Sequence, residues 1–143
     1  MGVRRYRDLI AWQLADGFKS EVFGLVRLSP KAQGDRPYRD QLISASSAVS
    51  KDIAEGFLRD SAGDFGRFLG FALGSLAEAE GRVADGVELR YFREEDCQEA
   101  FRFARRAAVA MTRLKISQHH YVWTAREERS RAEPRLSRRQ DKT

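Results

Sequence analysis

The feature that most constrains the fold is a line of apolar residues in the middle of the chain, which recurs in alternating steps of four and three. A helix with 3.6 residues per turn places such positions on one face, whereas a strand needs alternation at every second residue. The stretch from Ser61 onward therefore predicts an amphipathic helix, and Ser61 and Asp64 are placed to cap its first turn. The apolar positions are Phe65, Leu69, Ala72, Leu76, Ala79 and Val83.

Three further helices are predicted from the same kind of pattern. The first covers residues 6–28 and ends at Ser29-Pro30. The linker PKAQGDR leads to the second, residues 38–57, for which Pro37 suits the first turn. The fourth covers residues 94–116.

Two adjoining apolar lines run along the fourth predicted helix. They form either one broad core face or, together with extra apolar residues on the first helix, a surface for self-association. One line is Cys97, Phe101, Ala104, Ala108 and Met111, and the other is Ala100, Phe103, Ala107, Ala110 and Leu114.

The apolar pattern stops after Ser117, and this sets the expected domain organisation. A chain of 143 residues is the size of one ordinary domain. We expect an all-α domain, a helical bundle, over residues 1–117 and a basic, flexible C-terminal tail over residues 118–143. The net charge of +5 favours partners rich in phosphate.

A cytoplasmic protein without a membrane segment is expected. The start MGVRRYRDLIAW carries charges and no apolar run after them, unlike a secretory signal. The longest nearly apolar run, FLGFALGSLA, is far shorter than the roughly 20 residues of a spanning helix. The single Cys97 cannot form an internal disulfide.

Three glycines lie four residues apart on the third predicted helix, at Gly66, Gly70 and Gly74. Each costs about 1 kcal/mol against alanine in a helix interior. Either another helix approaches closely along this line, or these are tolerated surface glycines.

No constellation of side chains predicts an enzyme, a metal site or a cofactor. The Glu-x-x-His pairs of a metal-binding bundle are absent, and His119 and His120 are interpreted as a solvated chain end. Cys97 is interpreted as a small buried hydrophobe. Asp52 and Glu55 are either an acid–base pair or acceptors for an Arg or Lys on a neighbouring helix. The serines of the second helix, expected to bond back to the preceding turn, are Ser44, Ser46, Ser47 and Ser50.

The segments QLISASSAVSKDIAEG, YRDLIAWQLA and DFGRFLGFALGSLAEAE resemble a bacterial family of small four-helix-bundle proteins encoded within intervening sequences of 23S ribosomal RNA. They also resemble the accessory variability determinant proteins of diversity-generating retroelements. The resemblance implies an up-down-up-down antiparallel four-helix bundle that assembles into a ring-like homo-oligomer, a homopentamer in related proteins. It further implies that Ile53, Ala54, Glu55 and Gly56 form the turn after the second helix and are faced by Ser75 and Glu78. By the same resemblance, Asp52, Ser75 and Glu78 are structural residues of the family motif.

The chain departs from the family pattern at three positions. It has Asp52 where the family usually has Asn, Ser44 where the family has Arg, and Ala48 where the family has Ser. The loss of the Arg removes a basic group from the second helix.

The leading functional hypothesis is a non-enzymatic, homo-oligomeric module that binds RNA, DNA or a nucleic-acid enzyme. The alternatives are a scaffold with a protein partner, for which the basic residues are a solvated helix face, and an enzyme whose site gathers Asp52, Glu55 or Glu78 from separate subunits. The expected nucleic-acid contacts are Arg4, Arg5, Arg7, Arg102, Arg105, Arg106, Arg113 and Lys115.

Overall fold

A computed structural model describes residues 2–132, and every regular element in this range is helical. The four long helices are α1 (Ile10–Arg27), α3 (Arg36–Phe57), α4 (Ala62–Glu88) and α5 (Gln98–Ala132). The shorter elements are η1 (Tyr6–Asp8), α2 (Pro30–Gly34) and η2 (Glu94–Cys97). The all-α prediction is confirmed.

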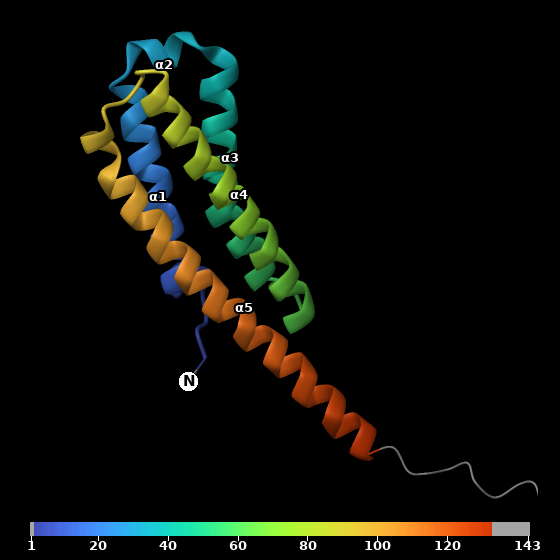
Figure 1. The fold of residues 1–143 in the computed structure, drawn as a ribbon. Coiled ribbons are helices and arrows are strands. Elements are labelled where there is room, and N and C mark those ends of the chain that lie inside the picture. Colours follow the sequence, from blue (N-terminus) through green and yellow to red (C-terminus); the bar gives the residue numbers. More distant parts are fainter. Residues whose placement is uncertain (1, 133–143) are drawn as a thin grey trace, which may run out of the picture.

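The four long helices lie side by side as an antiparallel bundle (Figure 1). Helix α3 packs against α1 and α4, and α5 packs against the same two helices from the other side. Short connections join α1 through α2 to α3, and a tight turn joins α3 to α4. We call the end that holds the α3–α4 turn the turn end, and the opposite end the loop end.

Side-chain caps explain where three helices begin. The Ser61 hydroxyl accepts a hydrogen bond from the backbone N–H of Asp64 at 3.1 Å, as predicted for the start of α4. Asp35 accepts from the N–H of Tyr38 at 3.3 Å and caps α3. Ser29 caps α2 in the same way, so part of the predicted linker forms a short helix instead. Each cap satisfies an N–H that has no partner within its own helix.

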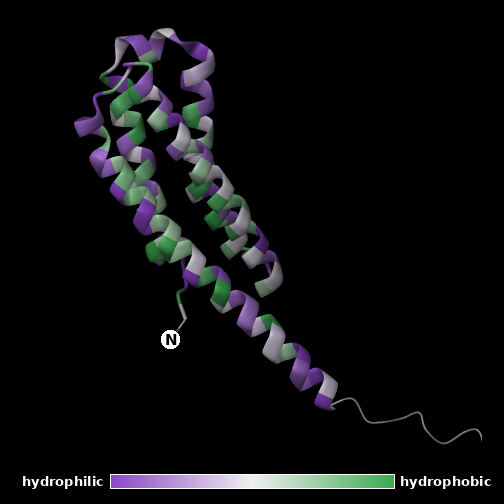
Figure 2. Cartoon of the chain, in the orientation of Figure 1, coloured by the Kyte–Doolittle hydropathy of each residue, from purple (hydrophilic) through white to green (hydrophobic). Residues whose placement is uncertain are grey.

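The core lies between the four long helices, where their apolar faces meet (Figure 2). All six residues of the apolar line predicted for α4 are buried. Both lines predicted for α5 belong to the core: four residues of α5 itself are fully buried, and Phe101 and Phe103 pack against them. The two lines therefore form one broad core face. The four buried residues are Ala100, Ala104, Ala107 and Met111.

Three glycines permit close packing between elements. A Cβ on Gly17 would lie 2.5 Å from the ring of Phe103, and one on Gly56 would lie 2.6 Å from Phe68. A Cβ on Gly86 would meet the hydroxyl of Tyr38 and the ring of Phe92. Real Cβ atoms are not found this close to other heavy atoms, so these three sites need glycine.

The three glycines spaced by four on α4 agree only in part with each of the two interpretations, which were close approach of another helix and tolerated surface positions. Added Cβ atoms on Gly66 and Gly70 would lie 3.8 Å from Gln118 and 3.2 Å from Lys115 of α5. Gly74 faces open space. Helix α5 thus covers the first two glycines without requiring them, and the third is exposed.

Helix α5 continues well past the predicted end near Ile116. It reaches Ala132 and extends beyond the other helices at the turn end (Figure 1). Val122 lies beside Gly63, in the first turn of α4. The rest of α5 therefore extends about 15 Å further, at 1.5 Å per residue. We call residues 123–132 the α5 extension.

The prediction that residue 118 begins a flexible segment is thus wrong for residues 118–132, while the last part of the predicted tail lies outside the described residues. Within the described residues, no helix is both long enough and apolar enough to cross a membrane.

Candidate nucleic-acid interface

Helix α5 carries a long basic segment without acidic residues. From Arg102 to Arg126 there is no Asp or Glu, and there are six Arg or Lys residues. The segment spans about 36 Å of helix. It is the most uniform concentration of positive charge in the described structure, because each of the other long helices contains acidic residues among its basic ones.

The arginines of this segment point to solvent. Arg102, Arg105, Arg106 and Arg113 are all exposed. Arg102 forms a surface ion pair with Glu99, with Nη1 and Oε1 3.4 Å apart. The other three form no ion pair with any residue in the range 2–132, so their guanidinium groups are available to phosphates.

Lys115 takes a different position from the arginines. It lies on the side of α5 that faces α4, and its Nζ passes over Gly70. The residue remains exposed at the edge of the two helices. It extends the basic surface toward α4 rather than along the outer face of α5.

The N-terminal arginines lie at the turn end of the bundle. Gly17 of α1 is opposite Phe103 of α5, and the two helices are antiparallel, so Arg7 lies at the level of Arg113 along the bundle. Arg4, Arg5 and Arg7 are exposed. The N-terminal arginines therefore lie near the level of Arg113 and Lys115, whereas Arg102, Arg105 and Arg106 lie about 10–16 Å nearer the loop end. Element η1 packs on α1 and α3 rather than on the outer face of α5.

Two of these arginines have intramolecular partners. Arg5 pairs with Asp8 at 3.5 Å, and both side chains are largely exposed. The guanidinium of Arg7 lies 5.7 Å from the ring centroids of Tyr6 and of Trp12. These weak contacts order Arg7 without neutralising its charge.

The extended helix adds an aromatic pair that the sequence interpretation missed. The rings of His120 and Trp123 stack with their centroids 6.4 Å apart and their planes 24° from parallel. Both are exposed; His120 continues the helical line of Arg106 and Arg113, and Trp123 lies on the neighbouring line of Arg105. The missed signal is the absence of any Gly or Pro from Gln98 to Glu133, which allows the helix to continue.

The family-motif residues of α3 lie in the last turns of that helix and not in a turn after it. Helix α3 extends to Phe57, with Ile53 fully buried and Gly56 packed on Phe65 and Phe68. The interpretation of these residues as a turn is corrected accordingly. Their helical register is what brings Gly56 against the first turns of α4.

At Gly56 the neighbours from α4 are residues of its first turns. Phe65 and Phe68 are these neighbours, and Ser75 lies about 10 Å further along α4, at 1.5 Å per residue from Phe68. Glu78 forms an ion pair with Arg82 on its own helix at 3.3 Å.

Asp52 and Glu55 are partly buried on α3, next to each other. Burial raises the pKa of the Asp52 carboxyl, and the neighbouring charge of Glu55 raises it further. Neither carboxylate forms an ion pair with another residue of the described chain, contrary to the acceptor role considered for them.

Cys97 is fully buried, as predicted. Burial raises the pKa of its thiol to about 11, and the nearby Asp96 and Glu94 add to the rise. The thiolate is thus disfavoured, which is the opposite of what a nucleophilic cysteine requires.

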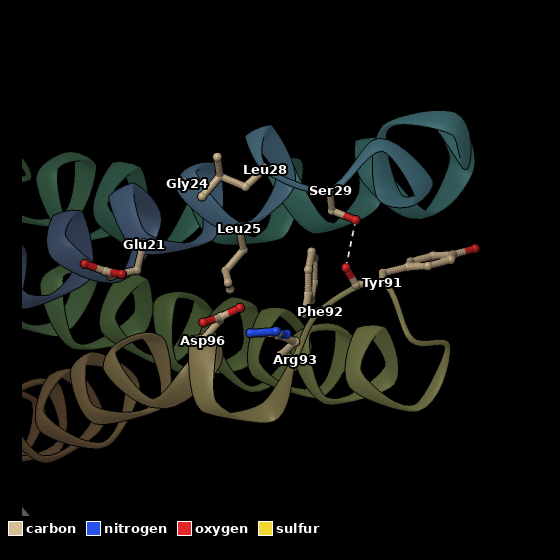
Figure 3. A pocket seen from close by; sticks show the side chains of 9 residues that line it. All are labelled: Glu21, Gly24, Leu25, Leu28, Ser29, Tyr91, Phe92, Arg93 and Asp96. Carbon is tan, nitrogen blue, oxygen red and sulfur yellow. Dashed lines mark hydrogen bonds between the residues drawn. The ribbon is translucent and has the colours of Figure 1, made fainter.

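A pocket of about 450 Å³ opens at the loop end, between the end of α1 and the segment that leads through η2 into α5 (Figure 3). Its charged members are Glu21, Arg93 and Asp96. The Ser29 hydroxyl in its wall donates to the carbonyl of Tyr91 at 2.8 Å and accepts from the N–H of Ala32, so it serves the fold. No three His, Cys, Asp or Glu side chains of residues 2–132 are grouped as a metal site requires.

One known protein family matches most of the chain. The model of the 23S rRNA-intervening sequence protein family matches residues 7–112. The chain belongs to this family. The matched range of the 23S rRNA-intervening sequence protein family covers α1, α3, α4 and the part of α5 that packs against α1. A search of curated proteins finds no match.

Proposed function

We propose that the protein is a non-enzymatic, homo-oligomeric module that binds nucleic acid in the cytoplasm. The observation that carries the proposal is the acid-free basic segment of α5, with three exposed arginines that have no intramolecular partner among the described residues. Unpaired cations on one surface attract a polyanion, and binding releases its condensed counterions. The family name is compatible with such a role, since it refers to ribosomal RNA.

The partner we propose is RNA, or an RNA/DNA hybrid. The resemblance to the retroelement accessory proteins favours the hybrid, whereas the family name favours RNA. Because the arginines of α5 attract phosphates, which carry no sequence information, we expect weak sequence preference and strong dependence on salt.

Self-association is supported by a second surface, on α4. Small residues follow one another in steps of four and three along its solvent side, and Cβ atoms added to Gly74 and Gly81 would meet nothing within 4 Å. Exposed glycines destabilise a helix by about 1 kcal/mol each, and close packing of another subunit would offset this. The ring of five subunits implied by the resemblance is the assembly we propose. The residues of this α4 face are Gly74, Ala77, Gly81 and Ala84.

Fluorescence anisotropy with labelled structured RNA and with an RNA/DNA hybrid tests the proposal. We expect binding that persists at physiological salt and weakens as salt rises. A triple variant replaces three arginines by glutamine: Arg105→Gln, Arg106→Gln and Arg113→Gln. In this variant the slope of the logarithm of the binding constant against the logarithm of the salt concentration should become less steep, by about one for each phosphate that is no longer neutralised.

A matched control removes the same charge from the loop end. Arg27, Arg36 and Arg93 are also exposed, and their replacement by Gln changes the net charge equally. Equal loss of affinity in both triple variants would contradict a specific surface on α5. An absence of binding by the unmodified chain would contradict nucleic-acid binding altogether and favour the scaffold with a protein partner.

A further inference from the structure

We propose that the outer face of α5 ends in a stacking site for unpaired bases, formed by Trp123 and His120, and that the preferred ligand is therefore single-stranded nucleic acid. This inference rests on the proposed function and specifies the form of nucleic acid that α5 binds. The site lies outside the residues that the family model matches.

The first support is the geometry of the two rings. Trp123 is 56% exposed although its ring is stacked on that of His120. The two residues are three positions apart on one helix, so the imidazole packs on the indole while much of the indole stays open to solvent. Aromatic surfaces of this kind stack on nucleobases, and because every base has a π-face the contact tolerates any sequence.

The second support is the charge along the helix. Arg113 lies about 15 Å along the helix from Trp123 toward the bundle, and Arg105, on the same side of the helix as Trp123, lies about 27 Å from it. Beyond Trp123 the extension mixes Arg126, Arg129 and Arg131 with Glu127 and Glu128. The uninterrupted positive charge therefore lies between Trp123 and the bundle, and it attracts a phosphate backbone anchored at Trp123 in that direction.

The shape of the surface selects single strands. The outer face of one helix is convex, and both rings are exposed on it. Bases in a duplex are already stacked and paired, so they reach such a surface only after unpairing. A single strand can bring its bases to Trp123 while its phosphates follow the arginines.

The same charges argue against a second copy as the occupant of this face. Two copies that met through this line would oppose the unpaired arginines of one to those of the other, without acidic residues between residues 102 and 126 to neutralise them. A polyanion neutralises them directly.

The test compares two exposed aromatic residues of α5. Trp123→Ala removes the stacking surface, and Tyr121→Ala is the matched control, because Tyr121 is 66% exposed and points to a different side of the helix. Both full-length variants are titrated into labelled oligouridylate and oligothymidylate of about 15 nucleotides and into a duplex of equal length. Circular dichroism confirms that each variant is folded.

We expect Trp123→Ala to weaken binding of both single strands about tenfold and to leave duplex binding unchanged. Tyr121→Ala should bind all probes as the unmodified chain does. Quenching of tryptophan fluorescence by oligothymidylate should disappear in Trp123→Ala, since Trp12, on α1, is the only other tryptophan of the chain.

The outcomes separate this inference from the proposed function. If Trp123→Ala binds single strands as tightly as the unmodified chain while the triple arginine variant binds them weakly, the stacking site is wrong and nucleic-acid binding stands. Equal weakening by Trp123→Ala and Tyr121→Ala also overturns it. If the unmodified chain binds no probe, both proposals fail together. A difference between the two single strands would identify RNA or DNA as the better ligand.

Discussion

At the scale of single residues, the helices come close together at three glycines. Gly17, Gly56 and Gly86 each lie where the next heavy atom would overlap with a Cβ. They are spread over α1, α3 and α4, and each one faces an aromatic side chain of another element. The large rings of the core therefore fit because the opposite helix has no side chain there.

Gly86→Ala is expected to destabilise the fold by about 1–3 kcal/mol, because its methyl group would have to displace Tyr38 and Phe92. The hydroxyl of Tyr38 donates to the carbonyl of Arg82 at 2.6 Å, so the displacement also strains a hydrogen bond. Urea denaturation measures the effect. Gly24→Ala is the control: its Cβ would meet nothing within 4 Å, and it should be neutral or stabilise by up to about 1 kcal/mol. Similar curves for both variants would contradict the close packing at Gly86.

Asp52→Asn is expected to stabilise the protein at neutral pH, by less than about 1 kcal/mol because solvent screens the half-exposed group. Burial, and then Glu55, raise the pKa of Asp52 above its ordinary value, so the folded state binds this proton more tightly than the unfolded state does. The resulting stabilisation is complete below the ordinary carboxyl pKa and is lost as pH rises through the raised folded-state value. Thermal midpoints at pH 7 and pH 3 test this. An equal gain at both pH values would show that the charge of Asp52 is not the cause.

At the scale of elements, regular apolar spacing predicted helices correctly. The loss of that spacing after Ser117 did not mark the end of a helix. The apolar line of α4 and the cap at Ser61 could be predicted because burial and capping act on residues close together in the sequence. The end of α5 could not be predicted from apolar spacing, because no residue of α5 after Met111 is buried and no core face imposes such spacing there. Its Arg, Glu and Ala residues favour the helix by propensity.

The candidate site could be predicted only in part, because the end of α5 could not be predicted from the sequence. The arginines of α5 were identified from their charge, but Trp123 and His120 join them only once residues 118–132 are helical. The position of the family-motif residues depended on whether α3 ended before or after Gly56, and boundaries of this kind are not determined by local sequence.

A chain that ends at Thr124 is expected to keep the thermal midpoint of the full chain within about 2 °C, because most of the α5 extension lies past the first turn of α4. Its helical signal in circular dichroism should fall in proportion to the helix removed. A clearly lower midpoint would show that the extension contributes to the packing of the bundle or of its assembly.

At the scale of the whole molecule, the two ends of the bundle differ in chemistry. At the loop end, hydrogen bonds tie the connections together: Tyr91 donates to Asp35 at 2.7 Å, and Ser29 donates to the Tyr91 carbonyl. At the turn end, the N-terminal arginines and the second half of α5 present positive charge. The polar side chains of one end thus stabilise the fold, while those of the other remain available to a ligand.

The proposed assembly predicts a mass in solution that is a multiple of the 16.3 kDa chain. Ala77→Arg, on the small-residue face of α4, should shift the mass measured by light scattering toward that of one chain, because a long charged side chain prevents close packing of helices. Ser20→Arg on α1, also at an exposed position, is the control and should leave the mass unchanged. A single-chain mass for the unmodified protein would contradict the assembly.

The length of α5 also has an evolutionary consequence. The family match ends at Thr112, close to the level along the bundle at which α1 begins. The α5 extension begins beyond the first turn of α4. Within one chain, substitutions, insertions and truncations in residues 126–132 encounter no packing constraint from the bundle, so under the proposed function selection acts on them through the ligand. Lineages that share the bundle are therefore free to diverge fastest here, and a fluorescent or affinity label attached at this point leaves the inherited fold intact.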